Sequence, residues 1–198
     1  MSDLVLASAS AARARLLEAS GVAARIDPAA IDEVRIKTEQ RARGAAAEDC
    51  ALLLAEAKAL AVVPRHPGAL VLGADQMLEC GAAWFDKPTS LEEARAKLRA
   101  LAGREHTLVT AITMVRDERV LWRHLERPRI TLRRFSDAFL DFYLDAMGSR
   151  ALRSVGGYEL EGLGAQLVAR LEGDYFAVLG LPLLPLLEFL RAQGALRA

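Results

Sequence analysis

Two charged residues, one directly after a short apolar segment and one across the following hairpin, are the strongest candidates for catalysis in this sequence. Asp75 directly follows the apolar run 69–74 (ALVLGA), and Lys87 lies in WFDKP after a predicted hairpin. The carboxyl ends of strands are where α/β sheets place reactive groups. A buried carboxylate is costly unless it meets a metal ion or a base. The position of Asp75 therefore favours a catalytic and a structural role about equally.

The first strand-to-helix turn carries hydroxyl and guanidinium groups. In LVLASASAARARLLEASG, Ser8 and Ser10 are followed by Arg13, and Ser10 is suited to cap the next helix. The free backbone N–H groups of a helix start and a nearby cation suit a phosphate group. The turn alone is also compatible with an ordinary capped helix whose arginines are solvated.

Glu33 and Lys58 carry little signal individually. Glu33 lies in AIDEVR, a predicted loop after the strand-like ARIDP, where an acid is usually solvated. Lys58 lies in an apolar helical segment between the small residues Ala57 and Ala59, and such lysines commonly extend to water. A shared role requires the fold to bring both residues to Asp75.

Other motifs are weaker. His66, His106 and His124 form no metal-ligand pattern, and His106 is expected to be a strand residue without a catalytic role. The glycine-containing segment 157–167 (GYELEGLGAQL) lacks the lysine of a P-loop and does not open a helix. We expect a hairpin near a ligand there.

The elements that must position these residues follow from hydrophobic periodicity and turn residues. The pattern alternates strands and helices but includes hairpins, so it predicts an α/β fold with a mixed sheet. The expected strands are 4–7, 69–74, 106–115, 119–132, two pieces within 156–171, and 176–179; the expected helices are 11–20, 46–63, 91–102, 136–147 and 182–193.

Composition excludes several classes. The 198 residues fit one domain or two small lobes that share a core, and 26 acidic residues balance 26 basic ones. Zero net charge and 6% aromatic residues argue against a nucleic-acid-binding protein. Cys50 and Cys80 fit no disulfide scaffold, no signal peptide is recognisable, and the longest apolar stretch is interrupted by Pro182, Pro185 and Glu188. We therefore expect a soluble, cytoplasmic protein.

Six segments in order resemble the Maf family of nucleoside triphosphate pyrophosphatases, and together they cover nearly the whole chain. They are LASASAARARLLEASGV, AIDEV, AEAKALAV, GADQM, DKPTSLEEARAKLRALAGREHTLVTA and GGYELEGLGAQLVARLEGDYFAVLGLPL. The resemblance implies a mixed α/β sheet flanked by helices, similar to inosine triphosphatase. It also implies a single domain over 1–198, with two lobes around a nucleotide-binding cleft.

The reaction implied by the resemblance is hydrolysis between the α and β phosphates of a nucleoside triphosphate, with Mg²⁺ or Mn²⁺. The family's residues fall on these positions: Ser8 and Arg13 on phosphate, with Ser10 beside them; Glu33 and Asp75 on the metal ion; Lys58 and Lys87 as catalytic cations; Asp75 as the catalytic aspartate. We assign the general base to Asp75 and metal orientation to Glu33, although the two could exchange roles. The expected partner is the nucleotide, with no nucleic acid or membrane, and a homodimer is considered.

One departure from the family concerns activity, and one resemblance to a subgroup of it concerns specificity. The family's proline and its following arginine or tryptophan are replaced by Ala11 and Ala12, so one contact to the substrate is missing. Gln76 with Glu161 resembles the subgroup that acts on 7-methyl-GTP, because a carboxylate can accept from the N1–H and amino groups of guanine. The alternative is a catalytically weakened nucleotide-binding protein that regulates cell division.

Overall fold

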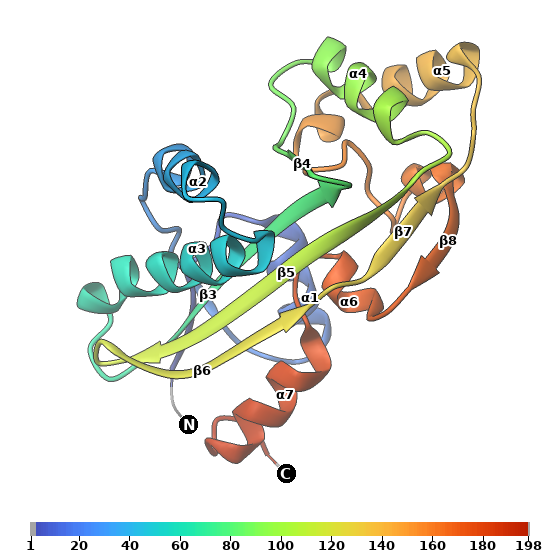
Figure 1. Cartoon of the computed structure of the whole chain (residues 1–198). Helices are drawn as coiled ribbons and strands as arrows, with labels where there is room; N and C mark the ends of the chain where they lie inside the picture. The colour runs from blue at the N-terminus through green and yellow to red at the C-terminus, as the bar shows by residue number, and fades with distance from the viewer. Residues whose placement is uncertain (1–2, 198) are drawn as a thin grey trace. The chain divides into compact units, whose positions relative to one another are not determined.

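The computed structural model describes residues 3–197, and Figure 1 follows the chain through them. Their elements are, in order, β1 (Leu4–Leu6), α1 (Ala11–Ala19), β2 (Arg25–Ile26), α2 (Glu33–Ala42), α3 (Ala47–Val62), η1 (Val63–Arg65), β3 (Leu70–Cys80), β4 (Ala83–Phe85), α4 (Leu91–Leu101), β5 (Glu105–Arg116), β6 (Arg119–Glu126), β7 (Arg129–Leu132), α5 (Asp137–Met147), η2 (Gly148–Leu152), η3 (Leu163–Leu167), β8 (Val168–Glu172), α6 (Tyr175–Val178) and α7 (Leu183–Ala192). The expected α/β fold with a mixed sheet is confirmed. The strands pair in the order β2-β1-β3-β5-β7-β8, with β4 on β3 and β6 on β5.

The described residues form two compact units. Unit 1 comprises residues 3–76, 110–126 and 180–197, and unit 2 comprises 77–109 and 127–179. Strands β3 and β5 contribute residues to both units, and each unit is described below by itself.

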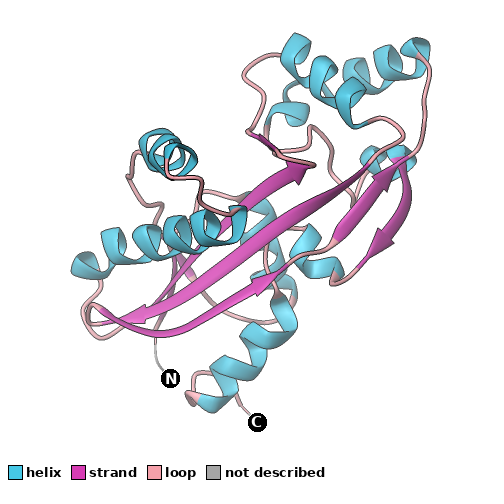
Figure 2. Ribbon diagram, in the orientation of Figure 1, coloured by secondary structure: helices cyan, strands magenta, loops and turns pink. Residues whose placement is uncertain are grey.

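In unit 1, β1 pairs in parallel with both β2 and β3, and β5 and β6 form an antiparallel hairpin. The three residues of β1 are buried, which fits a central strand with helices on its faces. The turn between β5 and β6 lies at Asp117 and Glu118, as predicted, and both residues adopt positive φ. Figure 2 shows α3 lying across the strands of this unit, where its apolar face is buried.

Most of the predicted helices are confirmed within a residue or two, since their capping residues define their starts. Ser10 caps α1, Ser90 caps α4 and Ser136 caps α5, each through its side-chain oxygen. Helix α2 was not predicted. Asp32 accepts a hydrogen bond from the backbone of Arg35 and starts this helix, so Glu33 is its first residue and does not lie in a loop.

Unit 2 has its own hydrophobic core between its strands and helices α4 and α5. Leu98, Leu101, Ile130, Leu140 and Tyr143 are fully buried there. β3 and β4 form the predicted hairpin through Gly81, while β7 pairs with both β5 and β8. The buried residues of this core all belong to unit 2.

Three strand predictions in the second half of the chain are wrong. The predicted strand 119–132 is divided into β6 and β7 around Pro128, which has no N–H for a ladder. Residues 176–179 belong mostly to the short helix α6, which Asp174 caps. Of the two strand pieces expected within 156–171, only β8 forms, because Gly164 packs against the backbone of Glu159 and the preceding segment is made of turns and η3.

No helix among residues 3–197 combines the length and apolar character needed to cross a lipid bilayer.

Candidate active site

Lys58 lies between two carboxylates in unit 1. Its Nζ is 2.6 Å from Asp75 Oδ1 and 3.0 Å from Glu33 Oε1. The Lys58 and Asp75 side chains are only 10% and 6% exposed, whereas that of Glu33 is 43% exposed. Three residues that are far apart in the sequence, of which Glu33 and Lys58 carried little signal individually, thus form one cluster.

The close packing of α3 on β3 brings Lys58 to Asp75. A Cβ atom added to Gly73 would lie 1.9 Å from the backbone oxygen of Ala55, so only glycine permits this approach. Gly73 lies two residues before Asp75 on β3, on the same face of the strand. Helix α3 therefore passes directly over that face, and Lys58 extends along it to the carboxylate.

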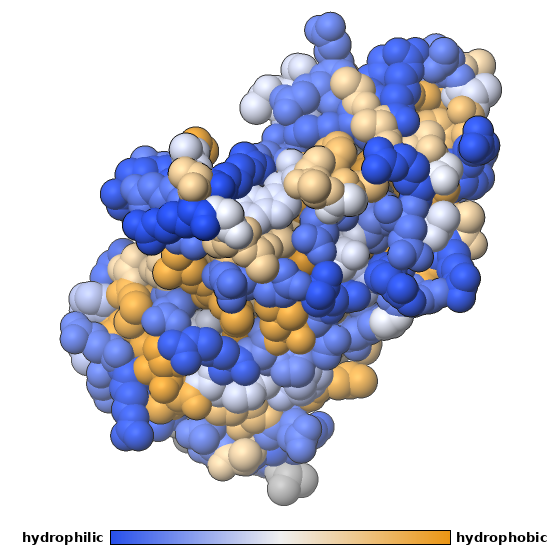
Figure 3. All heavy atoms as spheres, in the orientation of Figure 1, coloured by the Kyte–Doolittle hydropathy of each residue, from blue (hydrophilic) through white to orange (hydrophobic). Residues whose placement is uncertain are grey.

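Glu33 reaches the cluster because it begins α2. This helix lies beside α3, has no fully buried residue and presents a mostly hydrophilic surface in Figure 3. A carboxylate in the first helical turn is stabilised by the helix dipole. Glu33 therefore forms the solvent-facing side of the cluster, while Asp75 forms its buried side.

Asp75 retains one oxygen for a ligand. Its Oδ2 atom is buried and has no hydrogen-bond partner among residues 3–197. A buried carboxylate oxygen without a partner is costly, and a divalent cation or a water molecule would satisfy it. Oxygen ligands also suit Mg²⁺ and Mn²⁺, so the donor set of Asp75 and Glu33 fits the expected ion.

The protein supplies few ligands for such an ion. Among the described residues, no group of three or more His, Cys, Asp or Glu side chains is placed to hold a metal ion. A Mg²⁺ ion commonly keeps several waters and is bound through one or two carboxylates plus substrate phosphates. Two carboxylates at the Lys58 cluster are consistent with that mode.

Arg13 connects the first helix to the strand that carries Asp75. Its Nη1 donates to Ser8 Oγ and to the backbone oxygen of Ala74, both at 2.9 Å, and its Nε donates to the oxygen of Gly180 at 2.7 Å. Burial lowers the pKa of Arg13, and the charges of Asp75 and Glu33 oppose this change. The guanidinium therefore holds the backbone next to Asp75 and shares the electrostatic environment of the cluster.

The serines of the turn have distinct roles. Ser10 Oγ accepts from the backbone N–H of Arg13 and caps α1, as predicted. Ser8 Oγ accepts from the N–H of Ser10 at 3.3 Å and from Arg13. With both lone pairs engaged, the hydroxyl hydrogen of Ser8 is the group that it can offer to an anion.

Gln76, Lys87 and Glu161 are the remaining predicted site residues. Gln76 follows Asp75 on β3, so its side chain points to the opposite face, where it donates to Thr110 Oγ1 at 3.0 Å. Lys87 and Glu161 are exposed residues of unit 2, in the β4–α4 connection and in the turns before η3. Their part in the site stays a prediction.

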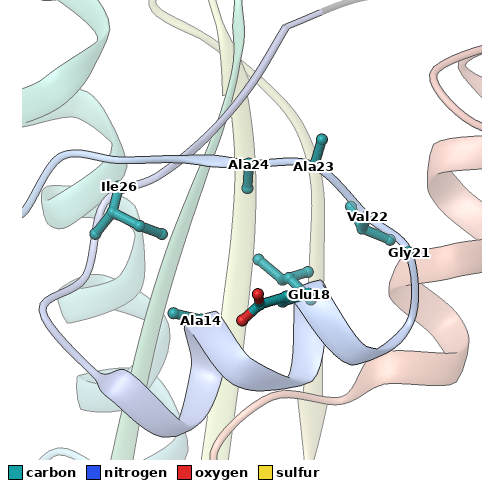
Figure 4. A pocket seen from close by; sticks show the side chains of 8 residues that line it. Ala14, Glu18, Gly21, Val22, Ala23, Ala24 and Ile26 are labelled. Carbon is teal, nitrogen blue, oxygen red and sulfur yellow. The ribbon is translucent and has the colours of Figure 1, made fainter.

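A pocket of about 470 Å³ elsewhere in unit 1 contains none of the predicted site residues. It lies between α1 and residues 21–26, and Figure 4 shows its lining with Glu18 and Ile26. The lining is otherwise made of alanine, glycine, leucine and valine. With one carboxylate and no cation, it is unsuited to a polyphosphate.

Residues 3–193 match the family model described as Maf-like protein. The chain belongs to the Maf family.

Curated Maf relatives cover nearly the whole chain. The chain is 52% identical to a nucleoside triphosphate pyrophosphatase of Paramagnetospirillum magneticum, over 97% of this chain and 99% of the relative. It is 50% identical to a protein of the same name from Granulibacter bethesdensis, over 98% of each. It is 48% identical to a 7-methyl-GTP pyrophosphatase of Rhizobium meliloti, again over 98% of each.

Sequence reasoning missed two residues on which the site of this Maf protein depends. Gly73 was part of an apolar run, and nothing in its spacing showed that α3 would pack on it. Gly180, in the segment AVLGLPL, was quoted only for its family resemblance, but its carbonyl oxygen holds Arg13. For both Gly73 and Gly180, the only signal in the sequence was a glycine that interrupts apolar residues.

Proposed function

We propose that this protein is a nucleoside triphosphate pyrophosphatase that hydrolyses the bond between the α and β phosphates and releases a nucleoside monophosphate and pyrophosphate. The observation that carries the proposal is the Lys58 cluster, in which a buried lysine holds a buried and a half-exposed carboxylate. The names of the curated relatives support the same reaction class, that of hydrolases acting on acid anhydrides.

In this proposal Asp75 is the general base. Its buried Oδ2 would accept a proton from the attacking water, while Oδ1 stays bonded to Lys58. Lys58 orients the carboxylate and balances its charge, and Glu33 orients the metal ion. Mg²⁺ or Mn²⁺, held by Asp75 and Glu33, would neutralise phosphate charge and polarise the reacting phosphorus.

The proposed phosphate contacts come from the first turn. Ser8 would donate its hydroxyl hydrogen to a phosphate oxygen, and Ser10 keeps the start of α1 in position. Arg13 adds positive charge next to the reacting groups, and we propose Lys87 as a further cation for the leaving pyrophosphate. In this proposal Ser8 and Lys87 act only by contacting the substrate.

A panel assay tests this function directly. Pyrophosphate release would be measured over standard, methylated and deaminated nucleoside triphosphates with Mg²⁺, Mn²⁺ or Co²⁺. We expect turnover of at least one triphosphate that depends on the ion. Tight nucleotide binding without turnover of any of them would instead support the catalytically weakened regulator of cell division, which the Ala11-Ala12 replacement in the first turn favours.

We propose 7-methyl-GTP as a candidate substrate, with Glu161 and Gln76 as specificity residues. The exposed Glu161 carboxylate can accept two hydrogen bonds from a guanine edge, whereas an amide suits uracil or thymine. Changing Glu161→Gln should shift the preference from guanine toward pyrimidine triphosphates, measured as the ratio of kcat/KM values. An unchanged ranking would remove Glu161 from base recognition.

The cellular setting is also a proposal. Cys50 and Cys80 are buried thiols that form no disulfide bond, which fits the reducing environment of a cytoplasm. A single two-lobed domain over 1–198 and a homodimer stay predictions, and the oligomeric state can be measured by light scattering.

A further inference from the structure

A buried polar pair in unit 2 has no part in the function proposed above. His106, on β5, is 2% exposed, and its Nε2 lies 2.6 Å from the hydroxyl oxygen of Tyr158, which is 5% exposed. The two rings meet edge to face with their centroids 5.8 Å apart. Two polar side chains in a hydrophobic core are expensive to bury, so their contact requires an explanation.

Both partners are neutral at physiological pH. Burial lowers the pKa of His106 to about 4 and raises the pKa of Tyr158 far above its ordinary value. The pair is therefore a hydrogen bond between an imidazole and a phenol and not an ion pair. Removing one partner would leave the other buried and unsatisfied, which costs more than the bond itself contributes.

The pair fixes residues 154–164, which form turns followed by the start of η3 and are called the 154–164 segment below. Tyr158 is, with Val155, one of its two most buried side chains, and the ring lies against Gly156, where an added Cβ would be 2.4 Å from Tyr158 Cε1. Ser154 Oγ donates to the backbone oxygen of Tyr158 at 2.7 Å. The side chain that His106 holds is thus the centre of the segment's own packing.

Further contacts extend this order toward Glu161. The hydroxyl of Tyr143 donates to the backbone oxygen of Gly157, and Arg150 pairs with the Glu159 carboxylate. Gly164 packs against the backbone of Glu159 so closely that an added Cβ would lie 2.4 Å from its oxygen. Glu161 lies between these fixed points and is itself exposed. Its position therefore depends on the contacts that hold its neighbours.

We propose that His106 is a positioning residue for base recognition: through its hydrogen bond to Tyr158 it fixes the 154–164 segment and so places the carboxylate of Glu161. This inference rests on the proposed function, because it assumes that Glu161 contacts the base. His106 touches no substrate in this proposal. It sets the preference among nucleotides and not the rate of the chemical step.

Two variants separate positioning from stability. Tyr158→Phe removes only the hydroxyl group and leaves Nε2 of the buried imidazole without a partner, in addition to Nδ1, which has none among residues 3–197. It should therefore lower both the melting temperature and the preference for guanine. The double variant His106→Leu with Tyr158→Phe removes both polar groups, so much of the lost stability should return. If His106 positions Glu161, the preference for guanine stays reduced in the double variant.

The preference would be measured by binding, so that it does not depend on turnover. For each variant, the dissociation constants of the α,β-methylene analogues of GTP and UTP give a ratio. We expect this ratio to change by about fivefold, in the direction of the ratio measured for Glu161→Gln. Amide hydrogen exchange over the 154–164 segment should also rise in both variants. A double variant with the wild-type ratio and wild-type exchange would overturn the proposal, as would an unchanged ratio in Tyr158→Phe.

A core variant supplies the stability control. Met147→Ala shortens a buried side chain of the same hydrophobic cluster without removing a hydrogen bond to the segment. It should lower the melting temperature and leave the GTP-to-UTP ratio unchanged, and a shift equal to that of Tyr158→Phe would overturn the proposal. Absence of turnover in the wild type would contradict the proposed function alone, since the binding ratio and the exchange still test His106.

Discussion

Lys58 illustrates how a single residue changes meaning once its neighbours are known. A lysine in an apolar helix commonly extends to water, but here its ammonium group contacts Asp75 and Glu33 and is nearly buried. An ion pair removed from water contributes little net stability by itself, because desolvation offsets the attraction. The ion pair is therefore better explained by a role of Lys58 in orienting Asp75 for the proposed reaction.

Replacing Asp75 by asparagine should abolish turnover while changing nucleotide affinity by no more than about tenfold. The amide cannot accept the proton of the attacking water, but it also removes a negative charge that repels the phosphates. Pyrophosphate release and equilibrium nucleotide binding would be measured on the same preparation. Activity near that of the wild type would exclude Asp75 as the base.

Replacing Lys58 by methionine should lower the free energy of unfolding by about 3–5 kcal/mol at neutral pH, because the buried Asp75 loses its cationic partner. Chemical denaturation measures this loss. The double variant Lys58→Met with Asp75→Asn should recover much of it, since no buried charge then lacks a partner. Equal stability of the single and double variants would show that the pair is not coupled.

The conformation of single residues could be predicted from the sequence where it depends on their immediate neighbours. The cap at Ser10 and the turn at Asp117 and Glu118 depend on neighbouring residues, and the structure confirms both. The meeting of Lys58 with Asp75 depends on helix packing at Gly73, which no local pattern contains. Asp75 was a candidate from its position after an apolar run, whereas the grouping of Glu33, Lys58 and Asp75 and their roles came from the family resemblance. The catalytic roles stay predictions.

At the scale of elements, Arg13 joins three parts of unit 1. It lies on α1 and bonds to the backbone of β3 at Ala74 and to the backbone before α7 at Gly180. Bonds from one guanidinium to two carbonyl oxygens fix these elements in a specific geometry. The family segment AVLGLPL, which had no assigned role, thus contributes to the position of the strand that carries Asp75.

Replacing Gly180 by alanine should reduce both stability and kcat. Gly180 has φ +97, which is unfavourable for alanine by about 1–2 kcal/mol, and the new Cβ would lie 3.4 Å from Arg13 Nε. Gly194→Ala is the matched control, since Gly194 has φ +67 and nothing within 4 Å. Thermal melting and turnover would be compared; equal kcat in the two variants would show that Gly180 acts only through backbone strain.

Elements were predicted well where hydrophobic periodicity and caps agreed, and poorly where tertiary contacts decided the outcome. Helices α3, α4, α5 and α7 lie close to their expected ranges. Helix α2 was missed because its composition is polar, although Asp32 was a usable capping signal. The 154–164 segment alternates apolar and polar residues like a strand, but its glycines allow close packing that prevents pairing.

At the scale of the whole molecule, the chain divides into two units with separate cores, and the buried polar groups differ between them. Unit 1 buries Asp75, Lys58 and Arg13, which are charged types, whereas unit 2 buries the neutral pair of His106 and Tyr158. Buried charged groups are suited to a reaction on a polyanion, whereas the neutral pair of His106 and Tyr158 is suited to holding a segment in place. This division is consistent with unit 1 carrying the reacting groups.

The protein should lose stability as the pH falls from about 6.5 toward 4. The pKa of His106 is lowered to about 4 by burial, so the unfolded chain binds a proton more readily than the folded one in this interval. The contribution is fully present above pH 6.5 and amounts to about 3 kcal/mol across the interval. Urea denaturation between pH 7 and 4.5 measures it, and His106→Leu should flatten the dependence; an equally steep loss in that variant would assign it to other groups.

Product analysis of the wild-type protein tests the central claim most directly. A triphosphate from the active part of the nucleotide panel would be incubated with the protein and Mg²⁺ in H₂¹⁸O, and the products followed by ³¹P NMR. Cleavage of the bond between the α and β phosphates predicts only monophosphate and pyrophosphate in equal amounts, with no product formed by Asp75→Asn. Formation of a nucleoside diphosphate and inorganic phosphate, or undiminished product from Asp75→Asn, would contradict the account.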